Sequence, residues 1–188
     1  MKSAILLHGL PSKREYYDAK QPSASNAHWF PWLQKQLLVN DVKAYTPEVP
    51  FVYKMIWDDW VKEVERFELN NDTLLIGHSM GAGFWIRYLS EHPKLKVSKV
   101  VLVAPWLNLD HEYDTDFFDF DMDSAILQSQ ELVIFNSDND SQGVQDTVSY
   151  LQAKLPKVHT VDFHNYGHFC YRDLKTDAFP ELLEEALS

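Results

Sequence analysis

Residues 73–81 read TLLIGHSMG, and this stretch carries the most specific signal in the chain. Its first four residues form an apolar, β-type run, and its last five match the pattern G-x-S-x-G, with Ser79 between Gly77 and Gly81. A helical pattern over residues 81–91 begins directly afterwards. A strand that turns at once into a helix exposes one side chain in a strained bend, and glycines flank it because a Cβ would collide with neighbouring backbone. The stretch therefore predicts that Ser79 is a nucleophile at a strand-to-helix elbow.

The context of the motif separates this prediction from its competitor, an inert serine in a tight turn. A five-residue pattern arises by chance in many chains. Here a β-type run precedes the pattern and a helix follows it, as the elbow requires. The positive end of that helix would also stabilise an oxyanion that develops beside Ser79. The context favours the nucleophile.

A nucleophilic serine needs a general base, and the loop after the last predicted strand supplies two candidates. In proteins with this elbow the chain order is serine, acid, histidine. His168 lies in that loop and follows Gly167, whose lack of a Cβ permits an unusual backbone conformation. His164 is the competitor, closer to the strand and without a preceding glycine. We predict that His168 is the base.

The base in turn needs a carboxylate that orients it, and residues 136–140 read NSDND after the fifth predicted strand. Both Asp138 and Asp140 are within reach. We choose Asp140, the deeper loop position, and keep Asp138 as the alternative. The aspartate that is not used is expected to cap the turn or the next helix.

Two backbone N–H groups are expected to form an oxyanion hole. One belongs to Met80, directly after the nucleophile. The other belongs to Leu10, because His8 and Gly9 follow the first predicted strand where such a loop is required. A plain turn at His8-Gly9 is the alternative.

Short apolar runs alternate with amphipathic patterns along the whole chain, which predicts an α/β fold with a mostly parallel sheet. The expected strands are residues 4–7, 42–46, 73–76, 97–103, 132–136 and 158–163. The expected helices are residues 29–40, 57–69, 81–91, 144–155 and 177–187. With helices on both faces, ligands bind at the carboxyl ends of the strands. We expect residues 1–188 to form a single domain.

Composition excludes several classes of function. The formal net charge is −11, so phosphate backbones and anionic membranes would be repelled, and we expect neither nucleic acid nor a membrane as partner. The single cysteine, Cys170, permits no intrachain disulfide, and no apolar run is long enough for a signal peptide or a membrane span. A cytoplasmic protein is expected. The serine chemistry requires no metal and no cofactor.

Several segments together resemble a known family. They are His8-Gly9, residues 28–33 (HWFPWL), the elbow at Ser79, residues 137–140 and Gly167-His168-Phe169. They look like the YdeN-like serine hydrolases, which are related to retinoblastoma-binding protein nine. The resemblance implies a minimal α/β-hydrolase fold, a three-layer α/β/α sandwich that lacks the first two strands of the larger fold. It also implies the strand order 4-3-5-6-7-8 in that fold's usual numbering.

The same resemblance implies esterase-type activity and a Ser–Asp–His triad. Ser79 matches the family nucleophile, His168 the base and Asp140 the acid. The family aspartate usually precedes a proline, whereas Ser141 stands here, which keeps the choice between Asp138 and Asp140 open.

We expect a serine hydrolase that acts on small acyl esters. The predicted pocket residues are His28, Trp29, Trp106 and Phe169. Residues 106–123 could form a short lid, in which Phe117, Phe118 and Phe120 line an acyl pocket or instead close the core. Two alternatives remain: a hydrolase-fold binding protein with a vestigial serine, and another acyl transfer, by a thioesterase, peptidase or acyltransferase.

Overall fold

A parallel sheet forms the centre of the molecule. The computed structural model describes residues 2–128 and 130–188. Within these residues the sheet has six strands in the order β2-β1-β3-β4-β5-β6, and all neighbouring pairs are parallel. The strands are β1 (Ser3–Leu7), β2 (Lys43–Tyr45), β3 (Thr73–His78), β4 (Lys99–Val103), β5 (Leu132–Ser137) and β6 (His159–Phe163). The α/β class and the strand order that the family resemblance implies are both confirmed.

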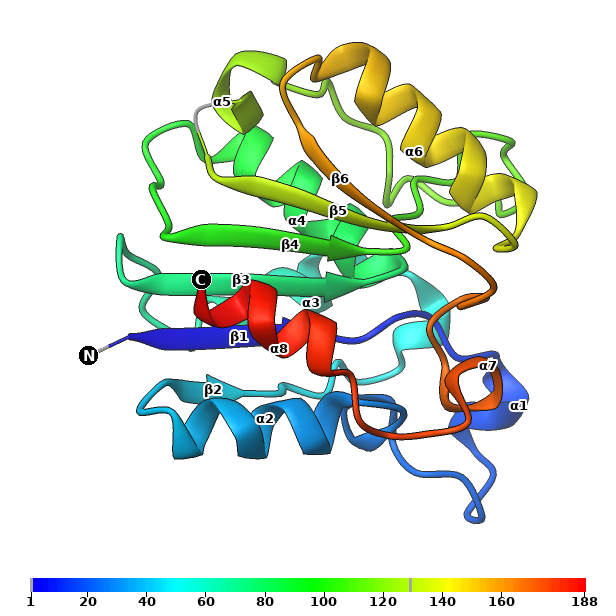
Figure 1. Cartoon of the computed structure of the whole chain (residues 1–188). Helices are drawn as coiled ribbons and strands as arrows, with labels where there is room; N and C mark the ends of the chain where they lie inside the picture. Colours follow the sequence, from blue (N-terminus) through cyan, green and yellow to red (C-terminus); the bar gives the residue numbers. More distant parts are fainter. Residues whose placement is uncertain (1, 129) are drawn as a thin grey trace.

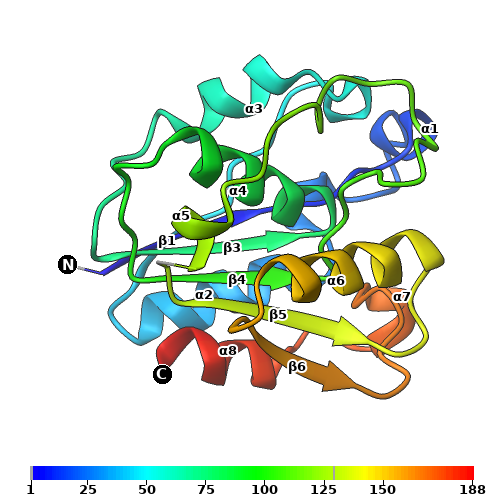
Figure 2. The ribbon, with the colours of Figure 1, turned by 90° about the horizontal axis from the view of Figure 1, so that it is seen from above.

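Helices cover both faces of the sheet and make three layers (Figures 1 and 2). On one face lie α2 (Phe30–Val39) and α8 (Pro180–Leu187). On the other lie α3 (Trp57–Val64), α4 (Met80–Glu91) and α6 (Gln142–Lys154). Four further helical segments lie in loops that carried no helix prediction: α1 (Lys13–Tyr16), η1 (Ala24–Asn26), η2 (Val52–Lys54) and α5 (Ser124–Gln128). A fifth, α7 (Tyr171–Leu174), follows the loop that carries His168.

Burial of the central strands explains their sequence. Every residue of β3 and β4 is buried, as is expected of parallel strands with helices on both faces. The register pairs Leu7 of β1 with Gly77, and His78 with Val103. The carboxyl ends of β1, β3 and β4 therefore meet at one edge, which is the right-hand side of Figure 1.

Aromatic side chains of the 106–123 segment close the core instead of forming a lid. Phe117 is fully buried, and its ring packs against Trp57, Trp60 and Phe84 of the helices on one face. Removing the apolar surface of these rings from water stabilises the fold, so the segment packs against α3 and α4. Of the two outcomes allowed for Phe117, core closure is the one observed.

At the opposite edge, a buried lysine attaches the last helix to the sheet. The ammonium group of Lys99 is 2.9 Å from the Glu185 carboxylate and 3.0 Å from that of Glu131. It also donates to the Glu185 carbonyl and the Ser188 hydroxyl. A buried charge is tolerated only with such partners.

None of the described helices combines the length and apolar character that a membrane span requires.

Candidate active site

Ser79 lies in a strained bend between β3 and α4. Its φ and ψ angles are 55° and −118°, a conformation that a residue with a Cβ rarely adopts. The Ser79 N–H donates to the Val103 carbonyl at 2.9 Å, and its own carbonyl accepts from Ala82, Gly83 and Trp106. Strain of this kind costs about 1–3 kcal/mol and persists only when the surrounding structure enforces it.

The flanking glycines are needed for packing. A Cβ on Gly77 would lie 2.5 Å from the Gly81 carbonyl oxygen. A Cβ on Gly81 would lie 2.5 Å from the carbonyl oxygens of both Leu7 and His8. These contacts are with backbone, which cannot move aside, so the first turn of α4 packs directly on the end of β1. The glycine requirement predicted from the sequence is present in the structure.

The His168 imidazole is hydrogen-bonded to Asp140. His168 Nδ1 lies 3.0 and 2.9 Å from the two carboxylate oxygens. The Asp140 side chain is 2% exposed and the His168 side chain 24% exposed. With Nδ1–H donating to the carboxylate, Nε2 carries a free lone pair, as a general base requires. Gly167, beside the base, has a φ of 56°, the conformation for which the sequence marked it.

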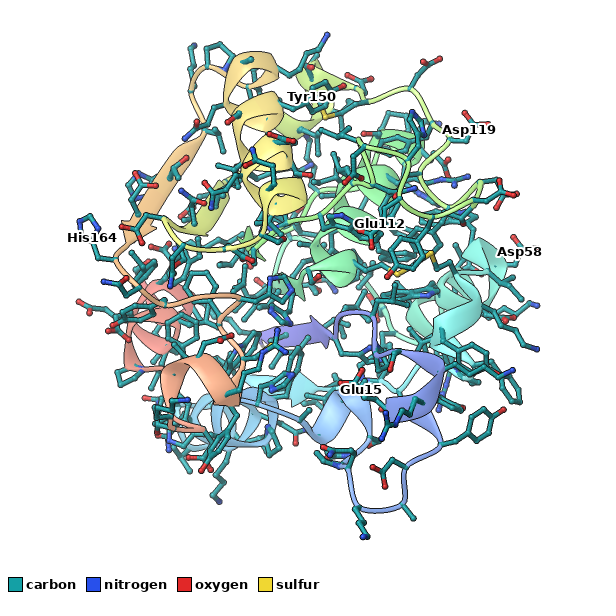
Figure 3. The ribbon with its side chains drawn as sticks, turned by 90° about the vertical axis from the view of Figure 1, so that its right-hand side faces the viewer. Glu15, Asp58, Glu112, Asp119, Tyr150 and His164 are labelled. Carbon is teal, nitrogen blue, oxygen red and sulfur yellow. The ribbon has the colours of Figure 1, made fainter. Side chains whose placement is uncertain are left out.

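Asp138 binds the competing histidine. Its Oδ2 is 2.7 Å from His164 Nδ1, and its Oδ1 accepts from the Asn165 N–H. Both side chains are largely in water, and His164 projects outward from the edge of the molecule (Figure 3). The Asn165 bond, more than His164, lowers the Asp138 pKa, whereas the Asp138 hydrogen bond raises that of His164. Asp138 thus holds the next loop and caps no helix.

Two polar residues that carried no functional prediction join the loops bearing Asp140 and His168. Asn139 Oδ1 accepts from the Gly167 N–H at 2.8 Å, and the Ser137 hydroxyl accepts from the Tyr166 N–H at 3.0 Å. Ser137 also donates to Asn139. Their signal in the sequence was their place between the candidate acids and the strand, and these bonds set the distance between Asp140 and His168.

Ser79 and His168 line one cavity of about 1070 Å³. His78, the residue before Ser79, contacts His168: its Nε2–H donates to the His168 carbonyl at 2.8 Å, and the ring centroids are 4.8 Å apart. Burial, and secondarily the nearby His168, hold the pKa of His78 well below its ordinary value. His78 is therefore a neutral support for the loop that carries His168.

Of the two expected oxyanion donors, Leu10 lies beside the same cavity and Met80 directly follows Ser79. Gly9 packs against Ser79 so closely that a Cβ there would lie 3.1 Å from the serine Cβ. Leu10 lines the cavity, and Met80 is the first residue of α4. Among the described residues, neither the Leu10 nor the Met80 N–H has a protein partner. Both N–H groups are therefore available to donate hydrogen bonds to a ligand.

His8 fixes the turn that precedes Leu10. Its Nε2 accepts from the Val49 N–H at 3.1 Å, so the proton of the neutral ring is on Nδ1 and donates to the Gly9 carbonyl at 2.8 Å. Burial lowers the pKa of His8, which keeps the ring neutral.

Most of the residues that line the cavity belong to segments 9–28 and 170–177, and the others are Phe30, Glu48, His78, Ser79 and His168. His28 lines it, as predicted. The prediction was wrong for Trp29, Trp106 and Phe169, which do not line it. Trp29 and Phe169 are fully buried against other aromatic rings, and Trp106 packs on Tyr113 and Phe118. Large rings gain more by joining the core than by facing solvent.

A family comparison agrees with this geometry. The family model described as serine hydrolase matches residues 21–181, which include Ser79, Asp140 and His168. The chain belongs to the serine hydrolase family.

This serine hydrolase is 27% identical to YdeN of Bacillus subtilis (strain 168) over 168 residues, which are 84% of this chain and 86% of YdeN. The crystal structure of the B. subtilis ydeN gene product superposes with a TM-score of 0.77 at 20% identity, over 98% of this chain and 96% of that one. An esterase from Exiguobacterium antarcticum superposes with a TM-score of 0.66 at 14% identity, over 100% and 92% of the two chains. At such identities the two superpositions show the fold.

Neither the cysteine thiol nor a cluster of metal ligands adds a second reactive centre to the described part of the serine hydrolase. The Cys170 thiol lines the cavity, but burial raises its pKa to about 12, so it carries almost no thiolate at neutral pH. Among the described residues, no three His, Cys, Asp or Glu side chains are grouped as metal ligands would be.

Proposed function

We propose that this serine hydrolase is a carboxylesterase that acts through a Ser79–His168–Asp140 triad. The observation that carries the proposal is the Asp140–His168 hydrogen bond at 2.9 Å, beside a cavity that His168 shares with a serine in a strained bend. An orienting acid, a base with a free Nε2 and a serine that reaches the cavity are the parts that serine acyl transfer requires.

The reaction proceeds in two halves. In the first, His168 Nε2 takes the Ser79 proton as the hydroxyl oxygen attacks the ester carbonyl carbon. The Leu10 and Met80 N–H groups bind the oxyanion, and one such donor contributes about 10²–10³-fold in rate. The C–O bond to the alcohol breaks, and the imidazolium gives its proton to that alcohol. In the second half, His168 deprotonates water, which attacks the acyl-enzyme and releases the acid and Ser79.

Each partner of His168 has a distinct part in this cycle. Asp140 holds the Nδ1–H tautomer and stabilises the imidazolium as it forms. The neutral His78 beneath the loop adds no competing positive charge to that imidazolium.

A fluorophosphonate probe tests the nucleophile. We expect the folded protein to form one adduct at Ser79, identified by mass spectrometry of the labelled peptide. Ser79→Ala should remove the adduct and reduce hydrolysis of short-chain p-nitrophenyl esters by at least about 10³-fold. Cys170→Ser, which keeps the shape of a cavity residue, should leave both the adduct and the turnover unchanged.

The outcomes also separate the alternatives. A folded protein whose Ser79 takes no label would support a hydrolase-fold binding protein. Faster turnover of thioesters or peptides than of esters would support a thioesterase or a peptidase. Product that forms only when an alcohol or amine is added would support an acyltransferase.

A further inference from the structure

His28 has a tautomer that its surroundings determine. The Tyr171 N–H donates to His28 Nδ1 at 3.2 Å, so Nδ1 must carry a lone pair. In a neutral imidazole the proton is then on Nε2. Burial, and then the nearby His168 and Arg172, lower the pKa of His28, so the ring stays neutral. The cavity is therefore lined by a ring that has one N–H donor in a fixed place.

The backbone holds that donor in position. His28 has a φ of 55°, which residues other than glycine adopt only when tertiary contacts enforce it. One contact is the bond to Tyr171, a residue 143 positions away that begins α7. The His28 ring also packs edge-on against the His78 ring, with centroids 6.0 Å apart.

His28 lies on the side of the cavity where the alcohol leaves. In serine acyl transfer the base hands its proton to the leaving group, so the alcohol lies beside His168. His28 and His168 line the same cavity, and His168 is close enough to contribute to the lowered pKa of His28. The Nε2–H of His28 is thus available to the alcohol part of an ester.

Acceptor groups line the same cavity. Glu15, Asp18 and Glu48 are among its lining residues, and each has one carboxylate oxygen bonded to a backbone N–H: that of Ser12 at 2.9 Å, Lys20 at 3.0 Å and Ser25 at 2.8 Å. These bonds orient the carboxylates at the cavity. Figure 3 looks onto this edge and labels Glu15, which lies in α1.

The mixture of groups selects the chemistry of the ligand. An anionic alcohol would face these carboxylates and be repelled. A cationic one would suit them, but it would face the Arg172 guanidinium and could not use the His28 N–H, since an ammonium group only donates. A hydroxyl group both donates and accepts, so a polyol satisfies the carboxylates and the imidazole together. Tyr16 and Tyr17 line the same wall and offer ring faces to its C–H groups.

We propose that the leaving-group side of this cavity binds a polyhydroxylated alcohol, such as a glycerol or sugar unit, and that His28 determines this specificity by donating from Nε2 to a hydroxyl oxygen. The proposal rests on the esterase function proposed above. The reaction is the same hydrolysis, with the polyol as the released alcohol.

The test compares acetate esters that differ only in their alcohol: 1-O-acetylglycerol, 6-O-acetylglucose, propyl acetate and acetylcholine. Released acetic acid is titrated at constant pH to give kcat/KM. Propyl acetate has the carbon skeleton of acetylglycerol without its hydroxyls, and we expect kcat/KM for acetylglycerol to be at least about 10-fold higher. The higher of the two polyol values identifies glycerol or a sugar as the source, and either result supports the proposal.

Two variants of His28 separate binding from folding. In His28→Asn, the side-chain oxygen can still accept from the Tyr171 N–H, and asparagine tolerates a positive φ, but the distal donor is lost. The ratio of acetylglycerol to propyl acetate should fall about 10-fold while the propyl acetate value stays within about 2-fold. In His28→Gln, an N–H near the Nε2 position should restore part of the ratio. His164→Asn, at an exposed histidine, should leave all four values unchanged.

Several results would overturn the proposal. They are wild-type kcat/KM values for both polyol esters that exceed the propyl acetate value by less than about 2-fold, a preference for acetylcholine, or an equal loss on all esters in His28→Asn, which a purely structural role would give. The wild-type ratio decides the matter even if a variant fails to fold. Hydrolysis of none of the four esters by a protein whose Ser79 takes the fluorophosphonate would remove the polyol site alone. Absence of the label would remove the esterase function itself.

Discussion

The pairs Asp140–His168 and Asp138–His164 have the same chemistry and nearly the same hydrogen-bond length, 2.9 and 2.7 Å. Their surroundings differ: the first pair has side chains 2% and 24% exposed, the second 50% and 86%. Electrostatic interactions are much stronger away from water, and of the two paired histidines His168 is the one that shares a cavity with Ser79. Enclosure next to the nucleophile, and not the presence of an aspartate beside a histidine, distinguishes the proposed triad from a surface ion pair.

The largest expected difference between the pairs concerns the histidines. His168→Ala removes the base and should lower kcat/KM for p-nitrophenyl acetate by at least about 10³-fold, because Ser79 then has no proton acceptor. His164→Ala should change it by less than about 2-fold, since surface substitutions rarely alter a distant site. Steady-state kinetics on both folded variants measures this. If activity were lost in His164→Ala and kept in His168→Ala, the base would be His164 and not His168.

The aspartates should show a smaller contrast. Asp140→Asn keeps the shape of the side chain but no longer stabilises the Nδ1–H tautomer, and we expect kcat to fall by about 10²–10⁴-fold. Asp138→Asn should remain within about 2-fold of wild type, because its partners are surface groups of the neighbouring loop. Circular dichroism of both variants checks that the fold is retained. Equal losses in the two variants would mean that the 137–140 loop acts through its conformation alone.

Acid should destabilise the enclosed site. His8 and His78 have lowered pKa values in the folded chain, so below about pH 6.5 the unfolded chain binds protons that the folded chain does not. The free energy of unfolding should therefore fall as pH decreases below that value, by up to about 1.4 kcal/mol per pH unit for each histidine. Urea unfolding at pH 7.5 and 5.5 measures the change. His78→Gln, which retains a side-chain N–H, should reduce the slope; a protein that gains stability on acidification would contradict the expectation.

The exposed pair should respond to pH in the opposite direction, and least of all. The pKa of His164 is raised by Asp138, so its contribution is present below about pH 6.5 and is lost as pH rises through the folded-state pKa. His164→Asn should thus have a slightly lower urea midpoint than wild type at pH 5.5 and the same midpoint at pH 9. High salt should remove the difference at pH 5.5, since exposed pairs are screened. A difference between the two urea midpoints that is larger at pH 9 than at pH 5.5 would show that the pair does not stabilise the fold through the charge of His164.

Local constraints made part of the site predictable from sequence. The bend at Ser79 depends on glycines beside it, and these lie within the motif itself. The chain order of serine, acid and histidine was expected from the elbow pattern, and the three residues can come together because the parallel strands end at one edge. The choice between Asp138 and Asp140 was not local, because it depends on the bonds from Ser137 and Asn139 to the loop at residues 166–167.

The cavity wall could not be predicted, and the reason is a competition for burial. The aromatic residues Trp29, Trp106 and Phe169 were expected in the wall, but packing against other rings removes more apolar surface from water. Polar residues of the loop between β1 and α2 line the cavity instead. Their arrangement depends on α7, from the far end of the chain, through the contact between Tyr171 and His28.

Every neighbour of β3 in the sheet is distant along the chain: Gly77 pairs with Leu7, and His78 with Val103. Parallel pairing of this kind gives few local contacts, and chains with such a topology fold slowly. The strained angles of Ser79 have no support until both neighbouring strands are aligned. A newly made chain would therefore lack this strained bend until its sheet is complete, so that maturation of the fold and onset of reactivity coincide.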